Sequence, residues 1–172
     1  MQKKTPGLSP LARNVLVLAV KIIGIVVVLT ILLFGIFGFS YVETNAMSPS
    51  ISGGDLVLTY HLDRNFIKGD AVVYHCGDKK CVGRVMATPG ETIEVDSDNR
   101  IYINNRLEDS DYYLRNVFPA DNNIKYPYAV NEGELFILGD NRLEYDDSRS
   151  FGAIKSDDIE GKIIGLFRTH GL

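Results

Sequence analysis

The chain has 172 residues, 45% of them hydrophobic, and a formal net charge of −4 at pH 7. This length suits one compact domain with a short additional segment, because a domain usually contains about 100–200 residues, and the hydrophobic content excludes a disordered protein. All 22 acidic residues lie in residues 43–172, whereas 4 of the 18 basic residues precede residue 43, so this portion has a net charge of −8. An acidic domain repels phosphate backbones, which argues against nucleic acid as a partner.

The N-terminal part contains an apolar run, residues 22–42, of 21 residues without a formal charge. At about 1.5 Å of rise per residue, a helix of this length spans roughly 30 Å, the thickness of a bilayer core. A cleaved secretory signal is the alternative, but its apolar core is usually about 7–15 residues long and ends in small residues. Here Phe34, Phe37, Phe39 and Tyr41 follow instead, and aromatic rings are typical of a membrane interface.

The charge distribution around this run predicts its orientation. Four basic residues, Lys3, Lys4, Arg13 and Lys21, precede the apolar run. The positive-inside rule then places the N-terminus in the cytoplasm. We expect a cytoplasmic tail over residues 1–13, a single transmembrane anchor over 14–42 that is helical to 41, and an extracellular domain over 43–172. The predicted location is the cell membrane.

After residue 43 the sequence changes to short β-rich runs separated by Gly, Asp and Asn, which is typical of strands and turns. Pro89-Gly90 predicts a turn and Asn104-Asn105 a tight hairpin. No stretch shows a helical period or an internal repeat, so the predicted fold class is mainly β, with one N-terminal transmembrane helix. The predicted strands are 56–60, 71–75, 82–86, 92–95, 101–103, 135–138 and 163–167.

Residues 107–131 are different, because they have few alternating positions but many aromatic residues. Two interpretations stay open: an ordered excursion whose aromatic rings cover the sheet, or a partner-binding surface, since aromatic side chains supply large contact area. The aromatic residues concerned are Tyr112, Tyr113, Phe118, Tyr126 and Tyr128.

Cys76 and Cys81 bracket four residues between two predicted strands. A disulfide across this hairpin would contribute about 2 kcal/mol by the chain-entropy relation, and two free thiols are the alternative. His75 adjoins Cys76, but no second group of ligands completes a tetrahedral set, so we expect no metal and no cofactor. His61 and His170 are expected to be ordinary surface residues.

The most informative segment runs from Gly139-Asp140-Asn141-Arg142 to Asp147-Ser148-Arg149-Ser150-Phe151-Gly152. A Gly-Asp-Asn turn after an apolar strand buries a carboxylate and an amide at the strand end, and the Asp-Ser-Arg run offers a guanidinium partner. Either half alone would indicate only a hydrogen-bonded loop. The combined pattern is too long for a chance match.

This segment resembles the last of the sequence boxes of the type I signal peptidases, and three others occur in the right order. Ala46-Met47-Ser48-Pro49-Ser50 resembles the nucleophile box, usually Ser-Met-x-Pro-Thr, and Gly69-Asp70-Ala71-Val72-Val73-Tyr74 the strand after it. The stretch from Gly83 to Glu91 resembles the lysine box, usually Lys-Arg-Val-x-x-x-Pro-Gly-Asp. The resemblance covers most of the chain except residues 97–131, and it implies a signal-peptidase-like β domain.

In that family a serine hydroxyl attacks the peptide carbonyl and a desolvated lysine amine takes its proton. The aligned boxes place Ala46 at the serine position and Gly83 at the lysine position. Arg84 is no substitute base, because a guanidinium stays protonated. Tyr145 occupies a position where many members carry a serine that hydrogen-bonds the lysine. The expectation is therefore a chain that is not an enzyme.

The resemblance also assigns the remaining residues of such a vestigial site. Thr44 matches the hydroxyl that assists the family's oxyanion hole, and two salt bridges are implied, Arg84 with Asp140 and Asp147 with Arg149. The other members of the expected site are Met47, Asn141 and Ser148.

A displaced nucleophile is the alternative to an inactive site, with Ser48 or Ser50 replacing the missing hydroxyl. A two-residue shift along an extended strand amounts to about 6.6 Å, more than catalysis tolerates. Another alternative is a peptidase altered at Ala46.

By resemblance, the predicted function is that of a non-catalytic scaffold or chaperone of Gram-positive pilus assembly. It would bind an extended segment of a secreted partner as an added β-strand, with a pilin subunit or a sortase as the partner. The first competing hypothesis is a working signal peptidase. The second is a self-associating module whose groove holds the protein's own chain.

Overall fold

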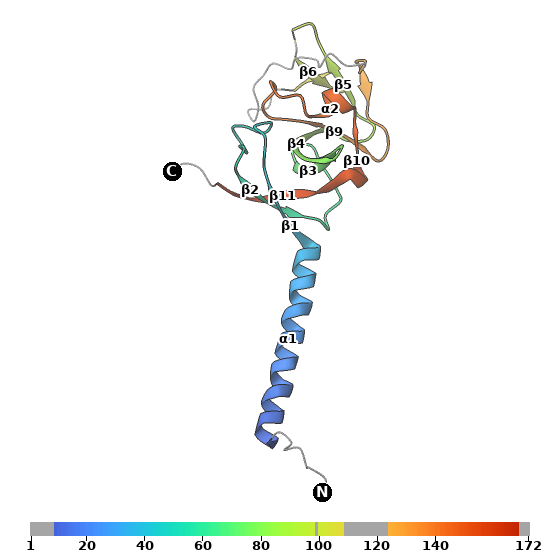
Figure 1. Cartoon of the computed structure of the whole chain (residues 1–172). Coiled ribbons are helices and arrows are strands. Elements are labelled where there is room, and N and C mark those ends of the chain that lie inside the picture. The colour runs from blue at the N-terminus through green and yellow to red at the C-terminus, as the bar shows by residue number, and fades with distance from the viewer. Residues whose placement is uncertain (1–8, 99, 109–123, 169–172) are drawn as a thin grey trace. The chain divides into compact units, whose positions relative to one another are not determined.

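The structure is a computed structural model that describes residues 9–98, 100–108 and 124–168. Contacts divide the chain into two units, Met1–Ile36 and Phe37–Leu172. Among the residues described, the first unit contains one helix and the strands lie in the second (Figure 1).

The helix of the first unit, α1, spans Pro10–Ile36 and has no buried residue. It is long and apolar enough to cross a membrane. It begins four residues earlier than expected, because Ser9 accepts a hydrogen bond at Oγ from Ala12 N (3.3 Å) and proline suits the first helical position. Residues 10–13, expected in the tail, are therefore helical.

The helix ends at Ile36, five residues before the expected end at residue 41. Phe37–Tyr41 forms strand β1 instead, and it pairs antiparallel with β2, Leu56–Tyr60, from Phe37 opposite Tyr60 to Tyr41 opposite Leu56. Composition did not reveal this change, because Phe and Tyr suit a strand as well as a membrane interface. The partner strand decides it.

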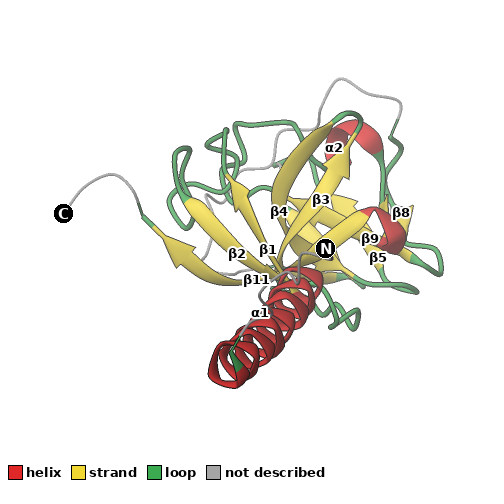
Figure 2. Cartoon of the chain, turned by 60° about the horizontal axis from the view of Figure 1, so that its bottom comes forward, coloured by secondary structure: helices red, strands yellow, loops and turns green. Residues whose placement is uncertain are grey.

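The second unit contains two antiparallel sheets (Figures 1 and 2). The larger has the order β1-β2-β11-β3-β4-β9-β10, and the smaller has the order β7-β6-β5-β8. All seven predicted strands are confirmed, and the mainly β fold class with them. The remaining strands of the larger sheet are β3 (Ala71–Cys76), β4 (Lys79–Ala87), β9 (Glu134–Leu138), β10 (Ile154–Lys155) and β11 (Ile159–Phe167). Those of the smaller sheet are β5 (Thr92–Val95), β6 (Ile101–Ile103), β7 (Arg106–Leu107) and β8 (Tyr128–Ala129).

Two short helical segments occur in the β unit, where no helix was expected. They are α2, Ser148–Phe151, and a 3-10 turn, Ser156–Asp158. Each is a single turn, too short to produce a helical period in the sequence.

The core of the β unit lies where β3, β4, β9 and β11 meet. Its fully buried side chains include Val72, Tyr74, Val85, Ile137 and Ile159. A second cluster joins the smaller sheet to β4 and β9 through residues such as Ile93 and Phe136. The alternation of these side chains along each strand explains why the strands could be predicted.

Two features expected from the sequence concern turns and aromatic residues. Asn104 and Asn105 have φ values of 50° and 62°, which is the two-residue hairpin geometry that asparagine tolerates, and they connect β6 to β7. Tyr126 and Tyr128 pack against the second core cluster, as the sheet-covering interpretation requires. The other three aromatic residues of the 107–131 stretch lie outside the described residues.

Candidate functional site

The candidate site lies where β9 ends and the Gly139-Asp140-Asn141 turn meets the turn that carries Ala46. Asn141 N donates to Ala46 O (2.9 Å), and Asn141 Nδ2 donates to Asn45 O (3.2 Å). A Cβ on Gly139 would lie 2.4 Å from Ala46 O. Only glycine permits this close approach of two backbones, so the first residue of the Gly-Asp-Asn pattern has a packing role that the sequence did not indicate.

The residues around Ala46 differ in exposure. Ala46 and Met47 are buried, and Met47 packs with Val42, Ile51 and Val57 in a third core cluster. Thr44 is exposed. Met47 is therefore a core residue that holds the turn against the sheet, whereas Thr44 is accessible beside it.

Gly83 stands opposite Val72 in the β3–β4 pair. A Cβ there would lie 2.5 Å from Ile137 Cγ2 and 3.2 Å from Tyr74 Cε1. The space beside Gly83 is thus filled by the side chains of β9 and β3, and a lysine would require Ile137 to move.

Arg84, the next residue of β4, forms the first of the two expected ion pairs. Its Nε and Nη2 donate to Asp140 Oδ1 (2.8 Å) and Oδ2 (2.6 Å), and its Nη1 donates to Gly69 O (2.8 Å). The Asp140 carboxylate is fully buried. This bidentate pair fastens the turn after β9 to β4 and to the loop before β3.

The second ion pair joins Asp147 and Arg149 within the turn that opens α2. Arg149 Nη2 and Asp147 Oδ2 are 2.6 Å apart, and both side chains are almost completely buried. Asp147 also accepts from Arg149 N (3.0 Å) at the helix N-cap and from Gly139 N (3.1 Å). Ser148 Oγ accepts from Ile137 N (2.9 Å). Asp147 and Ser148 therefore connect α2 to β9.

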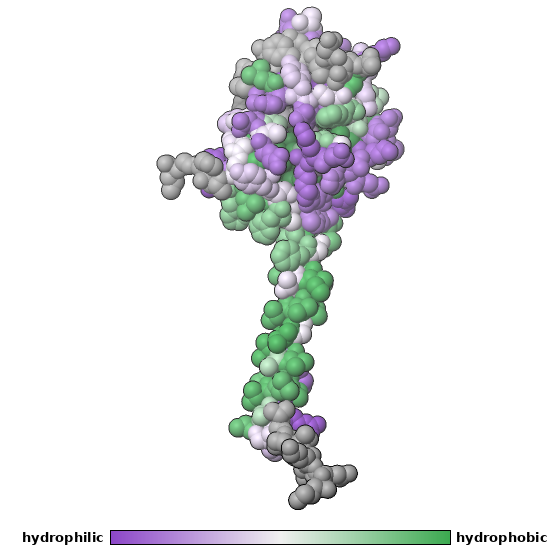
Figure 3. Space-filling view, in the orientation of Figure 1, coloured by the Kyte–Doolittle hydropathy of each residue, from purple (hydrophilic) through white to green (hydrophobic). Residues whose placement is uncertain are grey.

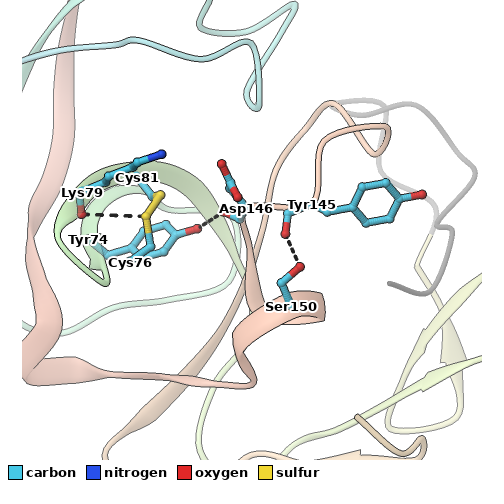
Figure 4. The surroundings of a disulfide bond; sticks show 7 residues. All are labelled: Tyr74, Cys76, Lys79, Cys81, Tyr145, Asp146 and Ser150. Carbon is cyan, nitrogen blue, oxygen red and sulfur yellow. Dashed lines mark hydrogen bonds between the residues drawn. A yellow bond between two sulfur atoms is a disulfide. The ribbon is translucent and has the colours of Figure 1, made fainter. Parts of the chain in front are cut away.

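Tyr145, at the position expected to carry a serine, covers the Arg149 guanidinium with its ring, 4.8 Å from the centroid. Its carbonyl accepts a hydrogen bond from Ser150 Oγ (Figure 4).

The neighbouring Asp146 O accepts from Tyr74 Oη (2.9 Å), and burial raises the pKa of Tyr74. Burial, and then the Asp147 charge, raises the pKa of Tyr126 to about 12. Both phenols therefore stay protonated.

The structure joins Cys76 and Cys81 in a disulfide across the β3–β4 hairpin (Figure 4). No group of three potential metal ligands occurs in the described part of the chain.

His61 is not an isolated surface residue as expected: its Nε2 lies 3.2 Å from Thr59 Oγ1 and 3.8 Å from Glu160 Oε1. His75 is exposed, and His170 lies outside the described residues.

Ser48 and Ser50 lie in a turn, not in an extended strand. Ser48 N donates to Asn45 O (3.0 Å), and Ile51 N donates to Met47 O (2.9 Å). The assumption of an extended chain at this point was therefore wrong, and the displacement from Ala46 is smaller than that geometry implies. Both serine side chains are half-buried, and neither hydroxyl has a hydrogen bond among the described residues.

The edge of β4 beside this site lacks a strand partner over part of its length. β4 pairs with β3 along residues 79–84, but its pairing with β9 on the other side begins only at Arg84. On that side residues 79–83 have no strand partner within the described ranges. Lys79 and Lys80 of this stretch are exposed, whereas Cys81, Val82 and Gly83 are buried. Only the beginning of the stretch is therefore open to an added strand.

The described residues thus define a class of β protein: an antiparallel β unit with this strand-end site, preceded by a helix long and apolar enough to cross a membrane. Residues 13–167 match the family described as signal peptidase, peptidase S26. The chain belongs to this family.

Several relatives carry the name signal peptidase I. The one from Bacillus caldolyticus is 31% identical over 157 residues, covering 82% of this chain and 84% of the relative. The one from Streptococcus pneumoniae serotype 4 is 29% identical over 160 residues, covering 70% and 77%. A solved signal peptidase I from Enterococcus faecalis V583 is 26% identical, covers 58% of this chain and 97% of its own, and has a TM-score of 0.46.

These comparisons contradict the expectation that the chain is not an enzyme, because the relatives are named for an enzyme, signal peptidase I. That expectation rested on three aligned positions, Ala46, Gly83 and Tyr145, while the match extends over most of the chain. None of these three relatives is named for pilus assembly, so the pilus assignment stays a prediction.

Proposed function

We propose that this chain is a membrane-anchored peptidase that acts on exported precursor proteins, as the name of its relatives implies. The observation that carries the proposal is the family match over residues 13–167, together with relatives named signal peptidase I. The exposed, unpaired residues Lys79 and Lys80 of β4 support it, because an extended segment can be added to an unpaired strand through backbone hydrogen bonds.

In this proposal the precursor segment lies along residues 79–83 of β4, beside the turn that carries Ala46. Both stretches contact the C-terminal end of β9: Gly83 lies against Ile137, and Ala46 against Gly139. A strand added at the β4 edge would therefore pass close to residues 46–50.

The proposal assigns the nucleophile to Ser48 or Ser50, because Ala46 has no hydroxyl. Both serines have unengaged hydroxyls in a turn that folds back beside the site. Among the described residues, no side chain suited to be the general base contacts either hydroxyl. The cleavage experiment therefore has to identify the nucleophile.

The test measures cleavage of a radiolabelled, signal-bearing pilin precursor by the full-length chain in detergent. An active type I signal peptidase is the positive control. Three variants identify the nucleophile: Ser48→Ala, Ser50→Ala and the double substitution. We expect cleavage by the unmodified chain and its loss in the double variant and in one single variant.

Cleavage that persists in the double variant would place the nucleophile elsewhere. The absence of any cleavage, with the positive control active, would overturn the proposal. Crosslinking of the precursor to residues 79–83 in that sample would then show that the chain binds a precursor without cutting it.

The partner and the orientation are part of the same proposal. We take a pilin precursor as the exported partner, with a sortase as a neighbouring one, and place the N-terminus in the cytoplasm because basic residues precede the apolar run. Protease added outside intact cells should then degrade the β unit and leave an N-terminal tag protected. Protection of the β unit would reverse the orientation.

A further inference from the structure

A pocket of about 310 Å³ lies between the β6–β7 hairpin and the loop before β3. It is at the end of the β unit where Figure 1 labels β5 and β6. Ile103, which is only 6% exposed, provides an apolar wall. Arg106 stands directly opposite Ile103 in the β6–β7 pair, and opposite residues of an antiparallel pair point to the same face. The hairpin therefore carries the Arg106 side chain on its pocket side.

Four charged side chains line this pocket, and two of them bind each other. Lys68 Nζ, from the loop before β3, contacts Glu108 Oε2, and the Glu108 side chain is only 7% exposed. This ion pair joins the loop before β3 to the residue that follows β7. Because its two charges neutralise each other, this side of the pocket offers no net charge to a ligand.

Glu91 and Arg106, the other two charged residues of the lining, form no ion pair among the described residues. The Glu91 carboxylate accepts hydrogen bonds from Thr88 N (2.8 Å), from Thr88 Oγ1 (3.0 Å) and from Asn104 Nδ2 (3.3 Å). These donors are uncharged, and a carboxylate has about four acceptor positions, so capacity for a ligand remains. The guanidinium of Arg106 donates no hydrogen bond within the described ranges.

Charged residues by themselves do not single out a site on this unit, since Figure 3 shows many hydrophilic residues on its visible face. The pocket differs because a carboxylate and a guanidinium line the same concave space and each lacks a counter-ion there. Opposite charges attract, but the hydrogen bonds from Thr88 and Asn104 hold the Glu91 carboxylate in place. A ligand that carries both an ammonium and a carboxylate would satisfy the two groups at once.

We infer that this pocket binds a short peptide with free termini, whose ammonium contacts Glu91 and whose carboxylate contacts Arg106. A guanidinium suits the second contact, because it binds a carboxylate through two parallel N–H···O bonds. The volume lies near the lower end of the range for small-molecule sites, roughly 300–1,000 Å³, which suits a peptide of about two or three residues. Ile103 offers contact to an apolar side chain. The pocket shares no residue with the β4 edge, and the inference is independent of cleavage.

The experiment is an NMR titration of the isotope-labelled full-length chain in detergent with the tripeptide Gly-Leu-Gly. Two matched ligands each lack one charge: the N-acetylated peptide has no ammonium, and the C-amidated peptide has no carboxylate. The variants are Glu91→Gln, which keeps an acceptor for Thr88, and Arg106→Gln at an exposed position. Arg100→Gln is the control, because Arg100 is exposed and does not line the pocket.

We expect Gly-Leu-Gly to shift the amide signals of Ile103 and Arg106 with a dissociation constant in the millimolar range or below. Each capped peptide should bind roughly tenfold more weakly, as should Gly-Leu-Gly to either pocket variant, because one charged hydrogen bond is lost. Arg100→Gln should bind like the unmodified chain.

The paired losses identify the contacts. Glu91→Gln should not weaken binding of the N-acetylated peptide further, and Arg106→Gln should not weaken binding of the C-amidated one. Equal affinity for free and capped peptides would overturn the inference, as would the absence of shifts at the pocket. Equal binding of the free and N-acetylated peptides alone would also overturn it, because the pocket would then recognise a simple anion.

Discussion

Arg84 holds both oxygens of Asp140, with donor–acceptor distances of 2.8 and 2.6 Å. The aspartate is fully buried and the arginine side chain is only 13% exposed. Through its third contact, with Gly69 O, the arginine also binds the loop before β3. One side chain of β4 thus fixes the turn after β9, against which the Ala46 turn lies.

Removing one partner of this pair should be costly. Arg84→Met leaves the Asp140 carboxylate buried without its cation, and we expect a loss of about 3–5 kcal/mol in the free energy of unfolding. Arg84→Met combined with Asp140→Leu should lose less, because no buried charge remains. The measurement is denaturant unfolding of the full chain in detergent.

A matched control is Arg100→Met, which breaks an exposed pair with Asp96. That loss should be much smaller than the loss in Arg84→Met, because solvent screens both charges of the exposed pair. Equal losses for Arg84→Met and Arg100→Met would contradict the structural role given to the Arg84–Asp140 pair.

The contact between Gly83 and Ile137 predicts a coupled pair of substitutions. Gly83→Ala places a Cβ 2.5 Å from Ile137 Cγ2, so we expect overpacking to cost about 1–3 kcal/mol. Ile137→Ala alone should cost about 2–5 kcal/mol through the cavity it creates. Together the two should cost less than their sum, since the added methyl enters the vacated space.

A double-mutant cycle measured by the same unfolding experiment tests this coupling. Gly165→Ala serves as the control, because its Cβ would meet only the Leu58 side chain, at 3.3 Å or more. Strict additivity of Gly83→Ala and Ile137→Ala would show that β9 does not fill the space beside Gly83.

The Cys76–Cys81 disulfide should make stability dependent on reductant. Because the bond closes a loop with a sequence separation of 5, its reduction should lower the free energy of unfolding by about 2 kcal/mol. The variant with both Cys76→Ser and Cys81→Ser should show the lower value with and without reductant. A reductant effect in that variant, or none in the unmodified chain, would be inconsistent with the bond.

Asp63 provides a prediction about pH. A hydrogen bond from Lys162, and then one from Asn65 N, lowers the pKa of the Asp63 carboxyl. A carboxyl with a depressed folded-state pKa stabilises the fold above its unfolded-state pKa, and this contribution is lost as the pH falls through the folded-state value. In Lys162→Met the Asp63 pKa should therefore rise.

NMR titration of the Asp63 carboxyl in both proteins measures this change. Asp96 is the internal control, because its pKa is lowered first by a backbone hydrogen bond from Arg100, which Lys162→Met leaves intact. An unchanged Asp63 pKa in the variant would contradict the assigned cause.

The strands were predictable because each buries alternate side chains, and that period is written in the sequence. The end of the helix at Ile36 was not predictable, because Phe37, Phe39 and Tyr41 suit both a strand and a membrane interface. Pairing with β2 determines that they form a strand. The ion-pair residues were named through the family resemblance. The Gly139–Ala46 contact was missed, since a close approach between two distant backbones leaves no local pattern.

The sequence by itself determined the apolar helix, the alternating strands and the boxes that identify the signal peptidase family. These depend on local periodicity and on short motifs. Only the tertiary structure decided that Ile137 and Tyr74 fill the space beside Gly83, that Gly139 lies against Ala46, and that Phe37–Tyr41 pairs with β2. The physical reason is that these relationships join residues far apart in the chain, and strand order and register alone bring them together.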